Sequence, residues 1–355
     1  MTTVAVTGVA GAVGRRLVAA LDAHDDVRRI VGLDVRAPAG LTSPKLAFRA
    51  GDVGDVDLVD LFDGADVVVH LASEQAPSRD EAARHANNVE GARTVARAAA
   101  AAGVGQLVHL SSALVYGAHS DNDLPLTEDS PLRANPYFDA AEHALEVEEW
   151  LADFATSHPD LAVAVLRPAV LAGHGAHSAL TRLMEAPRFP TIKGHKPPMQ
   201  FAHTDDVAGA VAHVIGHRLS GPYNVASEGW LSFDEVTALV DRGLIELPEE
   251  VAFSSTERLW ELGLGYAPPG QLHYLMHPWV LSVDKLLATG WRPQHSNRDA
   301  LDALVAEHAD WLRVPGVRVR RSMLRGGLAT AGAALAVLLV LARIWRHRGG
   351  PAPDA

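Results

Sequence analysis

The sequence predicts an α/β fold: a doubly wound parallel sheet with a smaller second subdomain and a C-terminal hydrophobic helix. Over the first 170 residues, short runs rich in β-branched residues alternate with alanine-rich helical segments. The runs are continuously apolar rather than alternating, which is typical of strands buried on both faces. Strand and helix repeated in this order give a parallel sheet with helices on both faces.

The elements follow one another in a regular order. Strands are predicted at 3–8, 29–34, 67–72, 106–112 and 162–168, and helices are predicted to begin near Ala12, Val56, Arg79 and Asn135. From Leu171 onward, prolines break this regularity; a helix and a strand return over 201–225, and a further helix follows from Ser232. The alternating core therefore ends near residue 170.

This order also predicts the domain organisation. The chain is long enough for one large α/β unit with an ample core. We assign residues 1–312 to that unit, with the sheet core mainly at 1–170 and 201–226. The second subdomain is assigned mainly to 171–200 and 227–312, and residues 313–355 to a basic tail.

The composition excludes several kinds of site. The chain has no cysteine, which excludes disulfides, thiolate metal sites and cysteine nucleophiles. Its histidines show no HExxH or comparable ligand spacing, so we expect no metal site. The formal net charge is −12, but residues 313–355 hold eight arginines and one acid, so residues 1–312 carry −19. A body this acidic is not expected to bind nucleic acid.

The tail predicts a membrane anchor. Residues 326–342 are apolar except for Thr330, and flanking arginines and Trp345 extend the usable helix to about 323–345. A run of this length is at the lower limit for crossing a bilayer core of about 30 Å. A buried C-terminal helix is the alternative, although such a helix normally has a polar face. The arginine excess before the segment predicts that the large domain lies on the cytoplasmic face.

The segment "AVTGVAGAVGRRLVAAL" predicts a phosphate-binding turn. Gly8, Gly11 and Gly14 lie between a strand and a helix, where a tight turn and a close backbone approach to pyrophosphate exclude a Cβ atom. The helix N-terminus then offers free N–H groups to the phosphates. Asp34 ends the second strand about twenty residues later, at the place where a carboxylate binds the adenine-ribose hydroxyls and repels a 2′-phosphate. These residues together favour NAD over NADP, although Arg36 lies nearby.

In this order, the motifs resemble those of the extended short-chain dehydrogenase/reductase family, which includes NAD-dependent epimerases and dehydratases. The opening "TGVAGAVG" is similar to the family's TGxxGxxG pattern, and "GDVGD" resembles the segment that places Asp52 near the adenine. "VVHLAS" is similar to the strand end that lines the cofactor with Leu71 and Ala72, and "LVHLSSALVYG" resembles the segment whose serine, Ser112, is catalytic. The resemblance covers residues 1 to about 305 and implies a Rossmann-type fold, NAD and a small-molecule substrate.

The resemblance also implies a catalytic tyrosine and a lysine four residues later. The lysine lowers the phenol pKa, which is otherwise near 10, so that the tyrosine can exchange a proton with the substrate. Two alignments fit "NPYFDAAEHALEVEE". One takes Tyr137 as the tyrosine and puts Ala141 at the lysine position; the other puts Ala140 and Ala144 at the two positions. Neither alignment provides a lysine.

Three interpretations follow. The chain is an NAD-dependent oxidoreductase or epimerase/dehydratase-like enzyme that uses Ser112, with Tyr137 or His143, for the proton; it is a catalytically inactive NAD-binding sensor or scaffold at the membrane; or it is an ordinary enzyme of the family. The tail and the alanine-lined site favour a lipophilic or lipid-linked alcohol or sugar as substrate. The sequence does not predict an oligomeric state.

Overall fold

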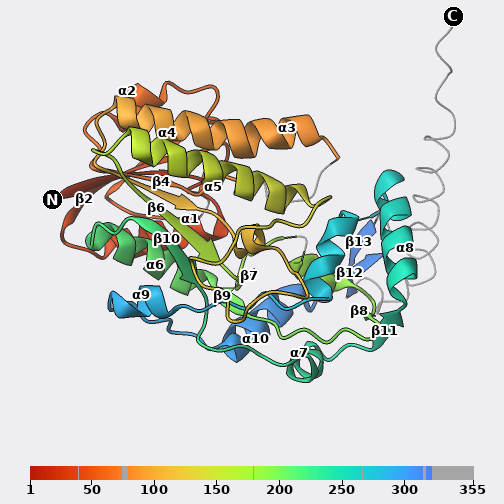
Figure 1. Ribbon diagram of the computed structural model, residues 1–355. Coiled ribbons are helices and arrows are strands. Elements are labelled where there is room, and N and C mark those ends of the chain that lie inside the picture. Colours follow the sequence, from red (N-terminus) through yellow and green to blue (C-terminus); the bar gives the residue numbers. More distant parts are fainter. Residues whose placement is uncertain (39, 74–78, 179, 266, 315–316, 322–355) are drawn as a thin grey trace, which may run out of the picture.

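The computed structural model describes residues 1–38, 40–73, 79–178, 180–265, 267–314 and 317–321. Its centre is a parallel sheet with the strand order β10-β6-β5-β4-β1-β2-β3 (Figure 1). The strands are β1 (Thr2–Thr7), β2 (Val27–Asp34), β3 (Leu46–Ala50), β4 (Val67–His70), β5 (Gln106–Leu110), β6 (Ala162–Pro168) and β10 (Gly221–Val225). The strand order reverses between β1 and β4, which is where doubly wound sheets bind ligands at the carboxyl ends of their strands.

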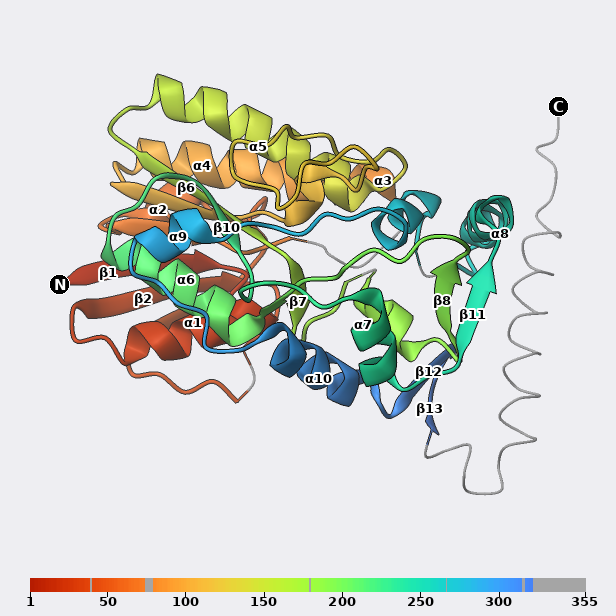
Figure 2. The ribbon, with the colours of Figure 1, turned by 60° about the horizontal axis from the view of Figure 1, so that its bottom comes forward.

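Helices cover both faces of the sheet (Figures 1 and 2). On one face α1 (Ala12–Asp22) packs against α6 (Thr204–Gly216). On the other face lie α2 (Leu58–Phe62), α4 (Gly91–Ala101) and α5 (Asp139–Ser157). A short helix, α3 (Glu81–His85), passes through one π-type turn, η1 (Ala86–Glu90), into α4.

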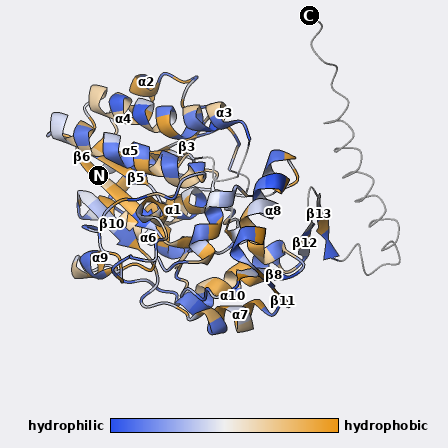
Figure 3. Ribbon diagram, turned by 45° about the vertical axis from the view of Figure 1, so that its right-hand side comes forward, coloured by the Kyte–Doolittle hydropathy of each residue, from blue (hydrophilic) through white to orange (hydrophobic). Residues whose placement is uncertain are grey.

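The strands are apolar on both sides because each side meets a different core. In β1, Val4 and Val6 belong to the core shared with α1 and α6, whereas Ala5 between them belongs to the core shared with α2 and α4. All three side chains are almost completely buried. Figure 3 shows the hydrophobic residues on the central strands and the hydrophilic residues on the outer helix surfaces. This explains the continuous apolar runs of the sequence.

Smaller elements build the rest of the described chain. They form three strand pairs: β7 (Val170–Ala172) with β9 (Phe201–His203), β8 (Phe189–Ile192) with β11 (Leu244–Leu247), and β12 (Trp311–Val314) with β13 (Val317–Arg320). The helices are α7 (Phe233–Val240), α8 (Glu249–Glu261), α9 (Asp284–Ala288) and α10 (Asn297–His308), and the 3₁₀ turns are η2 (Ala113–Tyr116), η3 (Thr181–Glu185) and η4 (Pro269–Leu275). Most of them gather at the end of the sheet where β8, β11 and α8 lie (Figure 2).

The predicted doubly wound parallel sheet is confirmed. The sequence does not predict β3, whose residues "LAFRA" are half-buried or exposed, because an edge strand lacks the continuous apolar run of its neighbours. The boundary between the sheet core and the second subdomain stays a prediction. The predicted anchor at 323–345 lies outside the described residues. Within the part that is described, no helix combines the length and the apolar character needed to cross a membrane.

Candidate cofactor cleft and catalytic pocket

The glycine turn lies between β1 and α1 and approaches the end of β4 closely. Gly8 has a φ of +77°, and a Cβ atom on it would lie 2.6 Å from the backbone N of Ala72. A Cβ atom on Gly14 would collide with the carbonyl oxygen of Gly8, so this glycine lets α1 pack against the turn. Only glycine satisfies both the left-handed φ and the close approach at position 8.

A cleft of about 480 Å³ opens beside this turn. Its lining comprises Gly8, Gly11, Leu33, Asp34, Val35, Arg36, Gly51, Asp52, Val53, Leu71, Ala72, Ser73 and Asn87. The cleft lies within the size range of pockets that hold small molecules and cofactors. Of the residues predicted to bind the cofactor, all but Gly14 are part of this lining.

The chemistry of the cleft fits a dinucleotide. Gly11 is the N-cap of α1 and has no side chain to accept from the first N–H groups, so the helix end presents donors to an anion. At the end of β2, the Asp34 carboxylate accepts hydrogen bonds from the N–H groups of Ala10 (2.9 Å) and Arg36 (3.0 Å). Asp52 accepts from Gly54 N–H at 2.9 Å. The phosphates and the adenine ribose of NAD therefore have matching partners in one cleft, where Asp34 lies beside the glycine turn.

A second, smaller pocket of about 40 Å³ adjoins the cleft, because Ala72 and Ser73 are lining residues of both. Its other lining residues are Asn88, His109, Leu110, Ser111, Ser112, Ala140, His143, Ala144 and Val147. Ser112 caps η2 and accepts a hydrogen bond from Leu114 N–H at 3.2 Å. The π-type turn η1 directs consecutive residues to different sites, with Asn87 at the cleft and Asn88 at the pocket.

The residues that the two alignments assign to the catalytic positions lie in different places in the structure. Ala140 and Ala144 line the pocket beside Ser112, whereas Ala141 is fully buried in the core. Tyr137 has a φ of +59° just before α5, is 77% exposed, and is not part of the pocket lining. Ser112 and Tyr137 are therefore not brought together. A continuous helix carries residues four apart to the same face, so positions 140 and 144 point into one pocket.

Two histidines of the pocket are neutral at pH 7. Burial, together with the nearby His70, lowers the pKa of His109 to about 3. Burial also lowers the pKa of His143, although the charge of Asp139 opposes the shift. His143 is buried, and its Nδ1 atom has no hydrogen-bond partner among the described residues. A neutral imidazole with an unpaired ring nitrogen can accept a proton.

A buried network fixes the residue beside Ser112. The Ser111 hydroxyl donates to Glu148, and Arg167 donates from Nε to the same carboxylate at 2.8 Å. Arg167 also donates to the Tyr116 hydroxyl at 2.7 Å, and that hydroxyl donates to Asn224 at 2.8 Å. Burial raises the pKa of Tyr116 to about 12 despite the nearby Arg167. Tyr116 therefore has a structural role and does not transfer a proton to a substrate. Because the Ser111 hydroxyl is bound to Glu148, Ser112 is the serine whose hydroxyl can bind a substrate.

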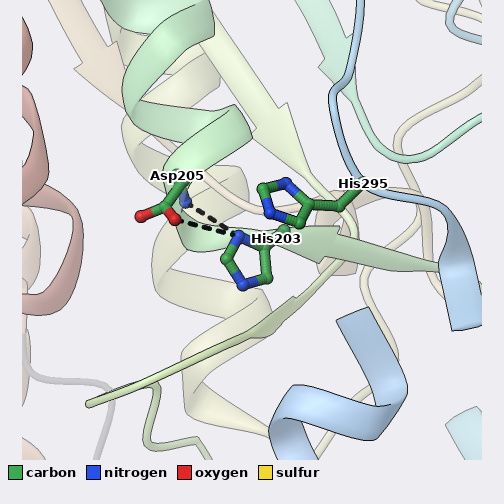
Figure 4. A group of neighbouring side chains, drawn as sticks. All are labelled: His203, Asp205 and His295. Carbon is green, nitrogen blue, oxygen red and sulfur yellow. Dashed lines mark hydrogen bonds and ion pairs between the residues drawn. The ribbon is translucent and has the colours of Figure 1, made fainter. Parts of the chain in front are cut away.

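One group of three metal-capable side chains, His203, Asp205 and His295, occurs in the described part of the chain (Figure 4). His203 Nδ1 accepts from Asp205 N–H at 3.3 Å and so caps α6, and the two imidazole rings stack at 3.8 Å. Arg16 pairs with the Asp205 carboxylate, and His295 contacts Asp206 at 3.1 Å. The atoms that could bind a metal thus already take part in contacts that hold α6 against α1 and against the loop before α10.

Comparison with known proteins identifies the family. The model of the NAD dependent epimerase/dehydratase family matches residues 4–226. The chain belongs to this family. The predicted resemblance is thereby confirmed, the cofactor is NAD, and the prediction of an enzyme of oxidoreductase or epimerase type is confirmed at the level of the family.

Individual relatives are more distant. A dTDP-glucose 4,6-dehydratase of Streptomyces griseus is 30% identical over 309 residues, which cover 76% of this chain and 90% of that protein. An uncharacterized protein of Mycobacterium tuberculosis is 26% identical over 253 residues, 69% of this chain and 67% of that protein. The UDP-glucose 4-epimerase of Thermus thermophilus, solved with NAD, has a TM-score of 0.67 at 22% identity and covers 87% of this chain and 99% of its own. This last likeness shows the fold.

Proposed function

We propose that the chain is an NAD-dependent oxidoreductase or epimerase/dehydratase that acts on a hydroxyl-bearing carbon through a non-standard active site. The observation that carries this proposal is the continuity of the two pockets, since Ala72 and Ser73 line both the cofactor cleft and the pocket of Ser112. NAD, when bound, supplies the hydride acceptor. The protein must then bind the substrate hydroxyl and take its proton.

We assign the proton transfer to Ser112 and His143. The chain has four lysines, Lys45, Lys193, Lys196 and Lys285, and none of them lines either pocket. The lysine that the family uses to activate a phenol therefore has no counterpart in this pocket. Ser112 can hydrogen-bond the substrate oxygen, and His143 can accept the proton because its imidazole is neutral. Ala140 and Ala144 leave room beside them for a substrate group.

The substrate class that we favour is a sugar carried on a nucleotide or a lipid. The relationship to a dTDP-glucose 4,6-dehydratase supports a sugar. The apolar segment at 323–345 supports a membrane anchor, and the arginines before it support a cytoplasmic position of the large domain. An anchored enzyme meets lipid-linked sugars or lipophilic alcohols at the bilayer surface, so these are the substrates to test beside soluble nucleotide sugars.

The second candidate function is NAD binding without turnover, in a sensor or scaffold at the membrane. It is favoured by one observation: two alanines, Ala140 and Ala144, line the pocket at a helical spacing that suits a catalytic pair. A pocket without a proton-transferring group would still leave the cofactor cleft intact. The two candidates therefore differ in turnover and not in cofactor affinity.

The test uses the full-length protein in detergent micelles with nucleotide sugars and lipid-linked sugars. Enzyme-bound NADH is followed by absorbance, and products are followed by chromatography. His143→Gln and Ser112→Ala should each lower turnover by about 10²–10⁴-fold, with NADH affinity unchanged. The matched control is His85→Gln, because His85 lies next to His143 but is 41% exposed and outside the pocket lining.

The outcomes separate the candidates. If NADH binds and no substrate of either kind turns over, the chain is a binding protein. If turnover occurs but His143→Gln behaves like His85→Gln, the enzyme proposal stands and the role of His143 is wrong.

A further inference from the structure

The β12–β13 hairpin is fastened to the second subdomain by one buried carboxylate. Glu185, at the end of η3, is 1% exposed and accepts hydrogen bonds from Arg313 Nε (2.9 Å), Arg318 Nε (3.0 Å) and His308 Nδ1 (2.8 Å). These partners and the nearby positive charges hold the pKa of Glu185 down at about 2, although its burial acts in the opposite direction. A carboxylate with this many partners holds the hairpin in one position.

Arginines outnumber acids around this carboxylate. Besides the two that bond to Glu185, this region holds Arg182, Arg242, Arg320 and Arg321. Burial and then the charge of Arg313 lower the pKa of Arg182, and burial and then the charge of Arg321 lower the pKa of Arg242. Positive charge is therefore crowded beyond what Glu185 neutralises. The nearest acid along the chain is Asp310, directly before the hairpin.

The face of the hairpin that reaches Glu185 combines these charges with an aromatic ring, since Trp311 pairs with Arg320 and Arg313 pairs with Arg318. The guanidinium of Arg318 lies 3.8 Å from the centre of the Trp311 ring, and that of Arg320 lies 5.2 Å from it. Arg318 and Arg320 are exposed, and Trp311 is half-buried. A tryptophan beneath arginines is a combination that suits the boundary between water and lipid headgroups.

The hairpin also stands where the described chain ends. It lies near β8 and β11, at the end of the molecule away from β1 and β2 (Figure 2). Arg321 is the last described residue, and the predicted anchor begins two residues later, at Met323. If residues 323–345 enter a bilayer, the hairpin is the part of the domain closest to the headgroups.

We propose that the β12–β13 hairpin binds anionic phospholipid headgroups through Arg320 and Arg321 and thereby sets the orientation of the domain on the membrane. The proposal rests on the membrane attachment in the proposed function. Residues 1–312 carry −19, so an anionic bilayer repels most of the domain surface and attracts the basic hairpin. Because Glu185 fixes the hairpin to the second subdomain, the attraction between hairpin and bilayer orients the whole domain.

The experiment measures hairpin contact with lipid in the full-length protein. The chain has no cysteine, so Asp310→Cys gives a single labelling site on an exposed residue beside the hairpin. The labelled protein is reconstituted into phosphatidylcholine vesicles with or without phosphatidylglycerol, and headgroup spin-labelled lipid quenches the label. Arg320→Glu with Arg321→Glu is compared with Arg28→Glu with Arg29→Glu. The second pair makes the same charge change on two adjacent exposed arginines of β2.

We expect quenching in the anionic vesicles that falls as salt is raised and falls on the order of tenfold in the hairpin variant but not in the β2 variant. Equal quenching in both lipids, or no difference between the two variants, would overturn the proposal while membrane insertion stood.

Flotation after alkaline extraction reports insertion separately. If the protein does not insert but floats with anionic vesicles through Arg320 and Arg321, the hairpin proposal holds and the anchor fails. If it neither inserts nor floats, both fail. Vesicle binding abolished by added RNA would identify a nucleic-acid surface instead and overturn the lipid proposal.

Discussion

The cofactor cleft and the adjoining pocket of Ser112 share two lining residues but differ in how they are built. The cleft depends on backbone geometry: Gly8 in a left-handed conformation, the open N-terminus of α1, and Asp34 at a strand end. The pocket depends on the identity of side chains on one helix, where Ala140 and Ala144 stand. A backbone-built site is retained as long as the fold is, whereas two substitutions can change a side-chain-built site completely. Cofactor binding and proton transfer can therefore vary separately in this fold.

The largest effect should come from placing a lysine on the two faces of α5. Ala141→Lys puts a charge into the core, where position 141 is fully buried, and should lower the free energy of unfolding by about 3–5 kcal/mol. Ala144→Lys points into the pocket and should cost less than about 1.5 kcal/mol. Denaturant unfolding of both variants measures the difference. Equal destabilisation would show that position 144 does not face a pocket.

The next effect tests the backbone-built site. Gly8→Ala should weaken NADH binding by at least about a hundredfold, because the new Cβ atom lies 2.6 Å from Ala72 N and the turn must move. Gly64→Ala is the matched control, since Gly64 has a φ of +68° and no atom lies within 4 Å of the Cβ position. That variant should lose about 1 kcal/mol of stability and no affinity. Fluorescence titration with NADH measures both, and an unchanged affinity in Gly8→Ala would contradict the assigned turn.

The same contrast explains how much the sequence could predict. Gly8, Gly11 and Asp34 of the cleft lining were predictable, because they are fixed by sequence spacing from strand ends. Ser73 and Asn87 were not assigned to pockets, and the choice between Tyr137 and His143 stayed open, since these positions depend on how the π-type turn and α5 pack against the sheet.

The choice between the two α5 alignments likewise needed the structure. Tyr137 looked available in the sequence, but helix α5 begins only at Asp139, so the tyrosine is left outside the helical face that reaches the pocket.

A further prediction concerns the buried histidines in the sheet beneath both pockets. Burial lowers the pKa of His70 to about 4 and that of His109 to about 3, from an ordinary value of 6.5. As pH falls from 6.5 toward 4.5, the unfolded chain takes up protons that the folded chain cannot, so stability decreases by roughly 2 kcal/mol per pH unit from these two groups. His70→Gln with His109→Gln should flatten this slope in denaturant unfolding series.

The measurement stays above pH 4.5 because Glu185 acts in a different range. Its lowered pKa contributes stability that is present above 4.5 and is lost as pH falls toward 2. An unchanged slope in the double histidine variant would mean that both imidazoles take up protons as readily in the folded chain as in the unfolded chain, and the lowered pKa values would then be wrong.

The smallest effect separates charge from geometry in the cleft. Asp34→Asn keeps an oxygen that can accept from Ala10 and Arg36 N–H but removes the negative charge. It should weaken NADH binding by about tenfold, or 1.4 kcal/mol, and strengthen NADPH binding relative to NADH, because the 2′-phosphate is no longer repelled and Arg36 lies in the same cleft. Asp34→Ala removes the acceptor as well and should weaken both cofactors further. If the Asp34→Asn and Asp34→Ala variants bind both cofactors alike, the carboxylate stabilises the turn and does not bind the ribose hydroxyls.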